Sequence, residues 1–248
     1  MKNYQDVVQD RFNQESDEDA ANSIYDASHP IGKYSRKYFF KGLSDFITWY
    51  KKNVQPGSEA KLLDLGCGTG GILDFFSQNG FAKHNLTGID LSEVRIKRAA
   101  QYFEGITFIC GDAVNFKLEN QKFDIITSFD LYSHLASKEE LIAAIKNASD
   151  HLSENGVFLW YDIYAKNHYA SSGNADSAGF SQQQMIDLVE SANLEVEYEK
   201  AFFKLFFNRY HSIYQAKRLP HGMLRFLEII LPGAPGNVML VCRKRKLG

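Results

Sequence analysis

The chain has 248 residues, of which 44% are hydrophobic, and its formal net charge is −2 at neutral pH. This length fits one α/β domain with additions, and the apolar fraction is sufficient for a sizeable core. The charge lacks the basic excess of proteins built mainly to hold nucleic acid, so a nucleic-acid partner is not expected.

Membrane, export and metal signals are weak in this sequence. No apolar run approaches the roughly 20 residues that span a bilayer, and the N-terminus MKNYQDVVQDRF has no signal-peptide core. The three cysteines are widely separated and form neither a disulfide framework nor a metal-ligand spacing. We therefore expect a cytoplasmic protein without a membrane span, with free thiols and no metal site.

The first 60 residues precede the predicted sheet and are expected to form a helical N-terminal cap. One face of an amphipathic helix is marked by four residues: Phe39, Leu43, Phe46 and Tyr50. This helical pattern ends before the Pro-Gly pair at 56–57. This helix either closes over a ligand or only covers one edge of the sheet, and the pattern leaves both readings open.

From residue 61 onward, short β-rich runs alternate with helical patterns. The runs are KLLDLG, NLTGID, ITFICGD, FDIITSF and GVFLWYDIY. Such alternation is typical of βαβ units and predicts a mostly parallel sheet with helices on its faces.

Three helices are predicted among and after these runs. The face of the first is marked by four residues: Ile96, Ala99, Ala100 and Phe103. The second begins at Ser137, with Glu140 completing a capping-box pattern, and continues to Leu152. The third starts at Ser181, with Gln184 three residues later as in a capping box. One face of this helix carries Met185, Leu188, Val189 and Ala192.

The end of the chain departs from simple alternation. Two β-rich segments, 194–207 and 237–245, have no clear crossover helix between them, which predicts an antiparallel pair. The intervening residues 208–236 are too many for a hairpin loop, so this insertion is expected to have structure or function of its own. A helix over 211–230 is predicted there, interrupted near Pro220 and Gly222.

The segment GCGTGG at 66–71 follows a predicted strand and precedes a helix. Without side chains, Gly66, Gly68 and Gly70 let the backbone turn sharply and let a ligand approach it. Gly66, Gly68 and Gly71 also satisfy G-x-G-x-x-G, so a nicotinamide dinucleotide has to be weighed as the ligand.

Three aspartates at successive strand ends favour a different nucleoside ligand. Asp64, before the first glycine, could accept from a ligand ammonium but would repel a pyrophosphate. Asp90 could accept from both ribose hydroxyls, and Asp112 could read an adenine amino group. Each aspartate alone is often a turn or helix cap. All three on the ligand-binding edge of such a sheet are hard to explain by capping.

These segments resemble the class I S-adenosylmethionine-dependent methyltransferases. LLDLGCGTG is similar to the first motif of that family, and GIDLS, GDAVNF and FDIITSFDLYSHL are similar to later motifs in order and spacing. The resemblance covers about residues 60–165 and the two terminal strands. It implies a doubly wound α/β fold whose mostly parallel seven-stranded sheet has a terminal antiparallel strand. The expected domain then spans 61–248, with the helical N-terminal cap 1–60 and the insertion 208–236 added to it.

The resemblance also implies S-adenosylmethionine as cofactor, with S-adenosylhomocysteine as product. It places Asp90 at the ribose, with Leu91 packed on adenine. The methionine end of the cofactor is implied to be lined by Asp64, Gly66, Cys67, Gly68 and Gly70, and the adenine edge to be framed by Asp112 and Ala113. Phe129 is implied to contribute its backbone near the methionine part. Tyr25 and Arg36 of the N-terminal cap are further candidates for the cofactor carboxylate.

Methyl transfer from a sulfonium is an in-line displacement, which needs alignment and exclusion of water more than acid–base chemistry. His134 is the candidate base, because an imidazole titrates near neutral pH, although it could instead cap a turn. Tyr164 and His168 could line an acceptor pocket. An aromatic segment could also line such a pocket, although core packing or a dimer contact explains it equally well. Its residues are Phe202, Phe203, Phe206, Phe207, Tyr210 and Tyr214.

The predicted function is methylation of a small-molecule acceptor enclosed by the segments 1–60 and 208–236, in a monomer or homodimer. A methyltransferase acting on transfer RNA, protein or glycan is the alternative enzyme. A basic patch joining Lys33, Arg36, Lys37 and Lys41 to the C-terminal basic run would favour RNA. A non-catalytic scaffold that kept the cofactor fold, and a nicotinamide dehydrogenase, are the remaining hypotheses.

Overall fold

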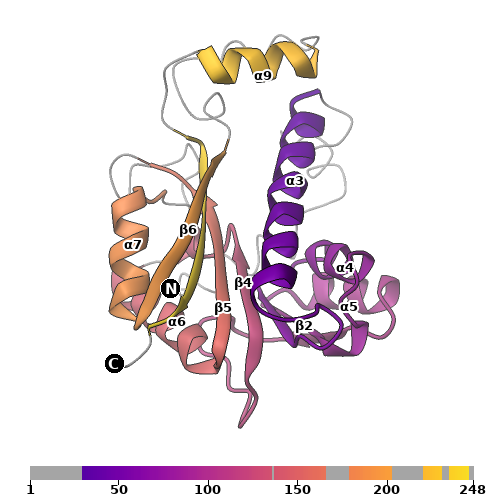
Figure 1. The fold of residues 1–248 in the computed structure, drawn as a ribbon. Coiled ribbons are helices and arrows are strands. Elements are labelled where there is room, and N and C mark those ends of the chain that lie inside the picture. The colour runs from indigo at the N-terminus through magenta and orange to yellow at the C-terminus, as the bar shows by residue number, and fades with distance from the viewer. Residues whose placement is uncertain (1–29, 136, 166–178, 203–219, 231–234, 246–248) are drawn as a thin grey trace, which may run out of the picture.

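The computed structural model of the chain describes residues 30–135, 137–165, 179–202, 220–230 and 235–245. A seven-stranded sheet lies at its centre, with the strand order β3-β2-β1-β4-β5-β7-β6 (Figure 1). The strands are β1 (Leu62–Leu65), β2 (Leu86–Asp90), β3 (Thr107–Cys110), β4 (Phe123–Phe129), β5 (Leu152–Ile163), β6 (Leu194–Phe202) and β7 (Asn237–Lys244).

The strand directions confirm the predicted sheet. β1 to β5 pair in parallel, whereas β7 is antiparallel to both of its neighbours, β5 and β6. The mostly parallel seven-stranded sheet and the antiparallel terminal pair are therefore confirmed, and all five β-rich runs of the middle of the chain form strands.

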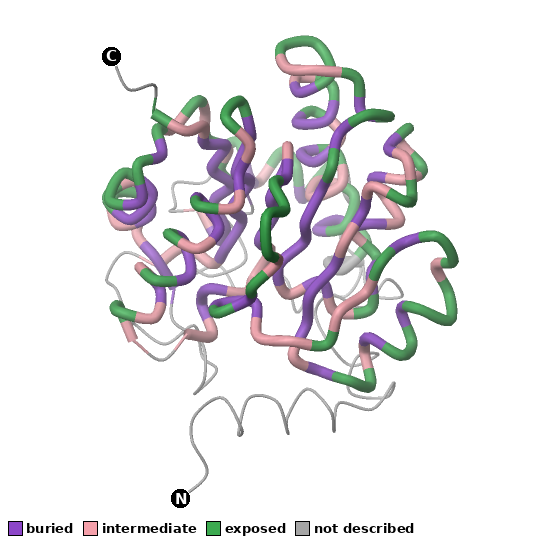
Figure 2. Tube along the Cα trace, turned by 90° about the horizontal axis from the view of Figure 1, so that it is seen from below, coloured by how far each residue is buried: buried purple, intermediate pink, exposed green. Residues whose placement is uncertain are grey.

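Helices cover both faces of the sheet. They are α3 (Pro30–Asn53), α4 (Gly71–Gln78), α5 (Glu93–Tyr102), α6 (Lys138–His151), α7 (Gln182–Ser191) and α9 (His221–Ile230), with short 3-10 turns η1 (Lys83–Asn85) and η2 (Tyr132–His134). Side chains of α3 and α4 belong to one buried cluster, and side chains of α6 and α7 belong to the other. Figure 2 shows the mostly buried strands between these partly exposed layers.

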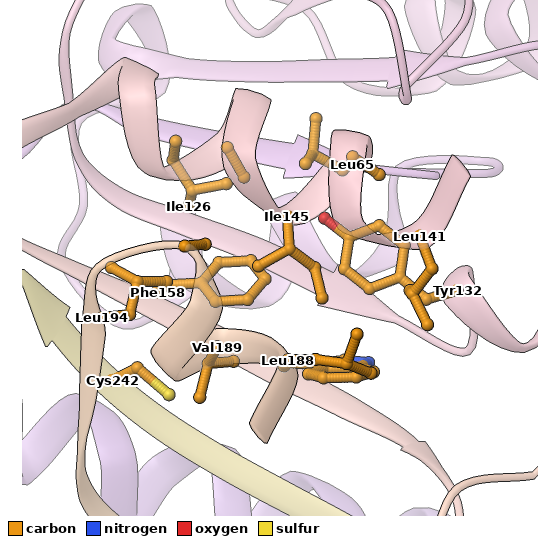
Figure 3. Close-up of a cluster of buried hydrophobic side chains, with 14 of the residues drawn as sticks. Leu65, Ile126, Tyr132, Leu141, Ile145, Phe158, Leu188, Val189, Leu194 and Cys242 are labelled. Carbon is orange, nitrogen blue, oxygen red and sulfur yellow. The ribbon is translucent and has the colours of Figure 1, made fainter. Parts of the chain in front are cut away.

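Alternation along β5 explains how one strand serves both clusters. Val157, Leu159 and Tyr161 point into the cluster beneath α3, and Phe158 and Trp160 point into the cluster beneath α6 and α7. Successive side chains of a strand face opposite sides, so a continuous apolar run suits a strand covered on both faces. Figure 3 shows Phe158 among side chains of the second cluster.

Helix α3 packs over the face of the sheet. Its residues Leu43, Phe46 and Tyr50 are buried in the same cluster as Leu62 of β1, Ile125 of β4, Val157 of β5 and Met239 of β7. The helix therefore does not merely cover one edge, and that reading of the sequence pattern is wrong.

Three details differ from the sequence predictions. Leu152 begins β5 and does not continue α6, since its backbone turns to an extended conformation after His151. Ala100 of α5 is exposed, while Ile96 and Ala99 are buried. Gly222 does not interrupt a helix: the carbonyl oxygen of Pro220 accepts bonds from the first turn of α9, which continues through Gly222. The rest of the predicted helix, 211–219, lies outside the described residues.

The predicted helix starts are largely confirmed. Ser181 and Gln184 form a reciprocal capping box at α7, and the Ser137 hydroxyl accepts the backbone N–H of Glu140 at α6. Across the described ranges, no helix is both long and apolar enough to cross a membrane.

Candidate functional site

The strand order predicts a ligand-binding crevice at the carboxyl ends of β1 and β4. The chain winds from β1 outward through β2 and β3, and then returns to the other side of β1 with β4 and β5. Ligands of open α/β sheets bind at the carboxyl edge where the winding reverses. Leu65 pairs with Ser128 at this edge, so the segments beginning at Gly66 and Phe129 flank the crevice.

The glycine turn after β1 is held against the end of β2. The backbone N–H groups of Gly66 and Cys67 both donate to the carbonyl oxygen of Ile89, at 2.8 and 2.9 Å. The N–H of Gly68 donates to Asp90 Oδ2 at 2.8 Å. These bonds fix the turn in one position relative to the strand ends.

The three predicted glycines have different roles in this turn. All have positive φ angles, which favour glycine. A Cβ at Gly66 would lie 3.0 Å from the Leu131 side chain, and a Cβ at Gly70 would lie 2.8 Å from the Phe108 ring. A Cβ at Gly68 would meet nothing within 4 Å. Gly68 therefore faces open space, where the backbone of the turn can be approached by a ligand.

Asp90 lies at the centre of this arrangement. Besides Gly68, it accepts the N–H of Ser92 on Oδ1 at 2.9 Å, and its side chain is mostly buried. A carboxylate that binds backbone donors after β1 and after β2 orders the glycine turn and the start of α5 together. The contact of Asp90 with ribose hydroxyls stays a prediction.

Asp64 lies behind the glycine turn, inside the sheet. It is 1% exposed, and Oδ1 accepts the Thr127 hydroxyl at 2.6 Å. Burial raises the pKa of Asp64 to about 7, opposed by the hydrogen bond from Thr127 and assisted by the charge of Asp90. At neutral pH this carboxyl group lies near its titration midpoint, so a nearby cation would favour its ionised form.

Asp112 is occupied by its own turn. Oδ1 accepts the N–H of Val114 at 2.8 Å, and Oδ2 accepts the Asn115 amide at 2.9 Å. The turn-capping role that is common for aspartate is thus present. Neighbouring Ala113 is buried in the cluster beneath α6.

Cys67 and Leu91 are two further predicted residues of the site. The side chain of Cys67 points into the core, where its sulfur would lie 2.6 Å from a Cβ at Gly88. Only the backbone of Cys67 is therefore available to a ligand at the turn. Leu91, directly after Asp90, is partly exposed.

The end of β4 and the segment after it bring an aromatic residue and two titratable groups to the other side of the crevice. The Phe129 ring packs edge-on against Phe39 of α3, with ring centroids 5.5 Å apart. Asp130 follows with a φ of 49°, a conformation uncommon outside glycine. His134 ends η2 and is partly buried.

Sequence reasoning missed the partnership of Asp130 with Asp162, at the carboxyl end of β5. Asp162 is fully buried and accepts the Ser133 N–H and the Trp160 indole N–H on Oδ2, both at 3.1 Å. Its charge is one cause of the raised pKa of Asp130. A charged residue within the apolar run GVFLWYDIY was the available signal.

The candidate residues of the caps are only partly described. Arg36 is exposed on α3, with its guanidinium 5.7 Å from the centre of the Phe40 ring. Tyr164 is partly buried, and its N–H donates to the Gly236 carbonyl. Phe202 is buried against Tyr161, with ring centroids 5.6 Å apart. The remaining candidates lie outside the described residues: Tyr25, His168, Phe203, Phe206, Phe207, Tyr210 and Tyr214.

Parts of the N-terminal cap and the insertion meet beyond the carboxyl edge. Ile163, which ends β5, pairs with Asn237, which begins β7, so the insertion departs from this edge. The Tyr34 hydroxyl of α3 donates to Glu228 Oε2 of α9 at 2.6 Å, and both side chains are buried. Figure 1 shows α9 lying across the end of α3. Helix α9 therefore lies next to α3 on the same side of the crevice and extends the surface that α3 forms there.

The described basic residues do not form one patch. Arg243 lies over the Trp49 ring and pairs with Glu197, and Arg245 pairs with Glu190. Trp49 is 16 residues along α3 from Lys33, or about 24 Å at the rise of an α-helix. Lys41 is paired with Asp45. Lys33 and Arg243 therefore lie near opposite ends of α3. Within the described ranges, no group of histidine, cysteine and acidic residues could hold a metal ion.

Comparison with known proteins places this site in a known class of domain. Residues 62–156 match the family model described as a methyltransferase domain. The chain is 32% identical over 111 residues to the malonyl-[acyl-carrier protein] O-methyltransferase of Bacillus anthracis, a match that covers 44% of this chain and 39% of that relative. The chain thus spans well under two thirds of the length of this curated relative.

Two solved structures show how far the fold likeness extends. Magnesium protoporphyrin IX methyltransferase from Synechocystis, solved with bound S-adenosylmethionine, matches with a TM-score of 0.65 at 15% identity, over 98% of both chains. The [4+2]-cyclase SpnF matches with a TM-score of 0.57 at 18% identity, over 82% of this chain and 80% of that one. At these identities the likeness concerns the fold alone, and the second neighbour is named for a reaction other than methyl transfer.

Proposed function

We propose that this chain, with its match to a methyltransferase domain, is a class I, S-adenosylmethionine-dependent enzyme that methylates a small-molecule acceptor held at the carboxyl edge of its sheet. The observation that carries the proposal is the glycine turn. Gly68, tied to Asp90, presents its backbone to open space beside the point where the sheet winding reverses.

The described residues fit the cofactor. Gly68 leaves room at the turn, and Asp90 beside it would accept the ribose hydroxyls. Asp64, near its titration midpoint, supplies a carboxylate whose ionisation the cofactor ammonium would favour. The adenine edge would meet Leu91, Asp112 and Ala113, with Asp112 also holding its own turn. When bound, S-adenosylmethionine supplies a methyl group already activated on a sulfonium.

The protein's own contribution is to bind, orient and exclude water. Phe129 and Phe39 give the crevice an apolar wall next to the end of β4. Such a wall favours close alignment of an acceptor and removes competing water. Helices α3 and α9 extend this wall, which supports an acceptor small enough to be enclosed and disfavours a polymer.

His134 is proposed as the group that removes a proton from an acceptor hydroxyl or ammonium. It lies just after β4, five residues beyond Phe129, and its positive charge is the smallest of the influences that lower the pKa of the buried Asp162. The same attraction favours the protonated form of the imidazole, which is the form that a base reaches after accepting a proton.

Calorimetric titration and a labelled-donor assay test the proposal. S-adenosylhomocysteine should bind the wild-type protein, and Asp90→Ala should weaken this binding by about 1–3 kcal/mol, the range expected for lost charge-assisted hydrogen bonds. Asp124→Ala, at the opposite end of β4, is the matched control. Incubation with a metabolite extract and isotopically labelled donor should yield a labelled small molecule. Label found only in RNA or protein would contradict the acceptor class.

A second candidate is a reaction other than methyl transfer on the same cofactor fold. The likeness to a [4+2]-cyclase supports it, because a fold alone does not specify a reaction. Binding of the cofactor without any labelled product, in extracts of diverse composition, would favour this candidate.

A further inference from the structure

Helix α9 carries large apolar side chains that do not pack against the rest of the fold. Leu224 and Glu228, four residues apart, are buried on its inner side, where Glu228 accepts the Tyr34 hydroxyl of α3. Four other side chains of the helix are between 47% and 65% exposed and are named here the outer face of α9: Met223, Phe226, Ile229 and Ile230. In the part of the chain that the structure describes, these are four of the six large hydrophobic residues that are exposed.

The outer face of α9 is one continuous stripe. Met223 lies three residues before Phe226, and Ile229 and Ile230 lie three and four residues after it. Side chains three or four positions apart are neighbours on a helix surface. Apolar side chains gathered in this way, rather than scattered singly, indicate a surface that contacts an apolar partner.

The charged side chains next to this stripe are basic. Glu228 is the one acidic residue of α9, and it faces inward. Arg225 is exposed at the border of the stripe, with its guanidinium 5.3 Å from the centre of the Tyr38 ring of α3. The ammonium group of Lys37 lies 6.0 Å from the centre of the same ring. Cations of both helices therefore meet beside the outer face.

The first turns of α3 add two more cations. Lys33 and Arg36 are exposed, and residues 30–44 contain no aspartate or glutamate. Tyr34, which binds α9, lies between Lys33 and Arg36 in the chain. These cations therefore belong to the end of α3 that α9 crosses.

The position of α9 leaves its outer face accessible to a flat surface. Figure 1 shows the helix lying across the end of α3, on the far side of that end from the sheet. An amphipathic helix binds a membrane with its axis in the plane of the interface, its apolar side chains among the acyl chains and its basic groups near the phosphates. The described part of α9 fits this orientation.

We propose that the outer face of α9 and the basic residues beside it dock the protein on a membrane surface that contains anionic phospholipid. Such a surface supplies an apolar layer for the stripe and negative charge for the cations. The inference goes beyond the proposed function, and it requires neither cofactor nor acceptor. Docking at α9 would hold the carboxyl edge of the sheet, from which the insertion departs, near the lipid headgroups.

Two other partners match the outer face less well. An RNA would contact the cations but leave the apolar stripe in water. A second copy of the chain, related by a two-fold axis, would bring the same cations against those of the first. Four exposed side chains are also few beside the roughly 20–30 residues that each side of a stable protein interface contributes.

Co-sedimentation of the full chain with lipid vesicles tests the proposal. The protein should bind vesicles of phosphatidylcholine mixed with phosphatidylglycerol more strongly than vesicles of phosphatidylcholine alone, and added salt should weaken the binding because it screens the cations. Replacing two residues of the stripe, Phe226→Ser with Ile230→Ser, should lower the partition coefficient about tenfold or more, since both side chains lose their apolar contact. Replacing two cations, Lys33→Gln with Lys37→Gln, should lower it about tenfold on the anionic vesicles.

A matched control removes exposed apolar side chains from another helix. Val94 and Tyr102 of α5 are 49% and 74% exposed, so Val94→Ser with Tyr102→Ser should bind the vesicles as the wild type does. A direct probe is Phe226→Trp, whose fluorescence should shift to shorter wavelength when anionic vesicles are added, as an indole does on leaving water. The wild type, with Trp49 and Trp160 alone, gives the background signal.

The outcomes decide between the possible partners. A folded wild-type protein that does not bind the anionic vesicles, or binds both kinds equally, overturns the proposal. Unchanged binding by the folded Phe226 and Ile230 variant also overturns it, because another surface would then contact the lipid. A dimer that dissociates in this variant, without vesicle binding by the wild type, would assign the outer face to a second copy. None of these results bears on cofactor binding, so the proposed function fails or stands separately in the calorimetric titration.

Discussion

Asp64 shows how a single buried carboxyl group links pH to stability. Its pKa is about 7 in the folded protein, whereas an unfolded aspartate titrates near 3.8. The folded state therefore holds a proton that the unfolded state has lost between these values. The stabilisation from the neutral form is complete below about pH 4 and is lost as the pH rises through about 7.

The prediction is that Asp64→Asn becomes increasingly stabilising as the pH rises. Asparagine resembles the neutral carboxyl group and can still accept from Thr127. The difference in free energy of unfolding between variant and wild type should grow by about 3–5 kcal/mol between pH 4 and pH 8, most of it below pH 7. Urea denaturation at several pH values measures it. A difference that does not vary with pH would mean that Asp64 is ionised throughout.

At the scale of the structural element, the glycine turn allows stability to be separated from binding. Gly68→Ala places a methyl group in open space and should cost only about 1 kcal/mol for the positive φ, while blocking a ligand. Gly70→Ala adds a close approach to the Phe108 and Phe103 rings and should destabilise the protein by more than that. Denaturation curves and S-adenosylhomocysteine titration of both variants measure the contrast. Equal stability losses with unchanged binding for Gly68→Ala would contradict this assignment.

The contact between α3 and α9 is a second element whose contribution is measurable. Tyr34→Phe removes the hydroxyl that donates to the buried Glu228 and leaves that carboxylate with a weaker set of partners. Loss of such a donor costs about 1–3 kcal/mol. Because the contact joins only these helices, amide hydrogen exchange over 221–230 should become faster, while exchange in β4 and β5 stays the same. Faster exchange throughout the sheet would show that α9 is part of the global core.

The elements were predictable because each is encoded locally. Apolar runs such as GVFLWYDIY specify strands buried on both faces, and Ser181 with Gln184 specifies a helix start within four residues. Leu152 was wrongly assigned to the preceding helix because an apolar residue at this position fits the end of a helical pattern and the start of a strand equally well. Only the pairing of Leu152 with Phe123 of β4 decides between them.

The partnerships within the site were not predictable in the same way. Asp130 and Asp162 lie 32 positions apart, and Tyr34 and Glu228 lie 194 positions apart. Neither pair has a local pattern, since each is created by the strand order or by a helix crossing. Single residues at strand ends, such as Asp90, were recognisable because the parallel sheet brings all strand ends to one edge.

At the scale of the whole molecule, the architecture separates the two edges of the sheet. The carboxyl edge carries the glycine turn, Asp90, the Asp130 pair and the contact between α3 and α9. The amino edge carries a polar cavity of about 780 Å³ between α6, α7 and the end of β7. Of its basic groups, Lys146 and Arg245 are paired with Asp150 and Glu190, and Lys244 donates to the Leu152 carbonyl. Function is therefore expected at one edge only.

Hydrogen exchange with and without S-adenosylhomocysteine tests this separation. A ligand that binds only the folded protein slows every exchange event that requires global unfolding, by a factor that depends on its concentration relative to its dissociation constant. Exchange through local opening is slowed only where the ligand makes contact. Residues 66–71 and 90–92 and the segment after β4 should therefore gain local protection, while 153–156 and 191–193 at the amino edge should not. Protection centred on the amino edge would instead place the ligand in the polar cavity. A ligand at the strand ends that carry Asp90 and Asp130 would be too far from the amino edge to slow local opening there.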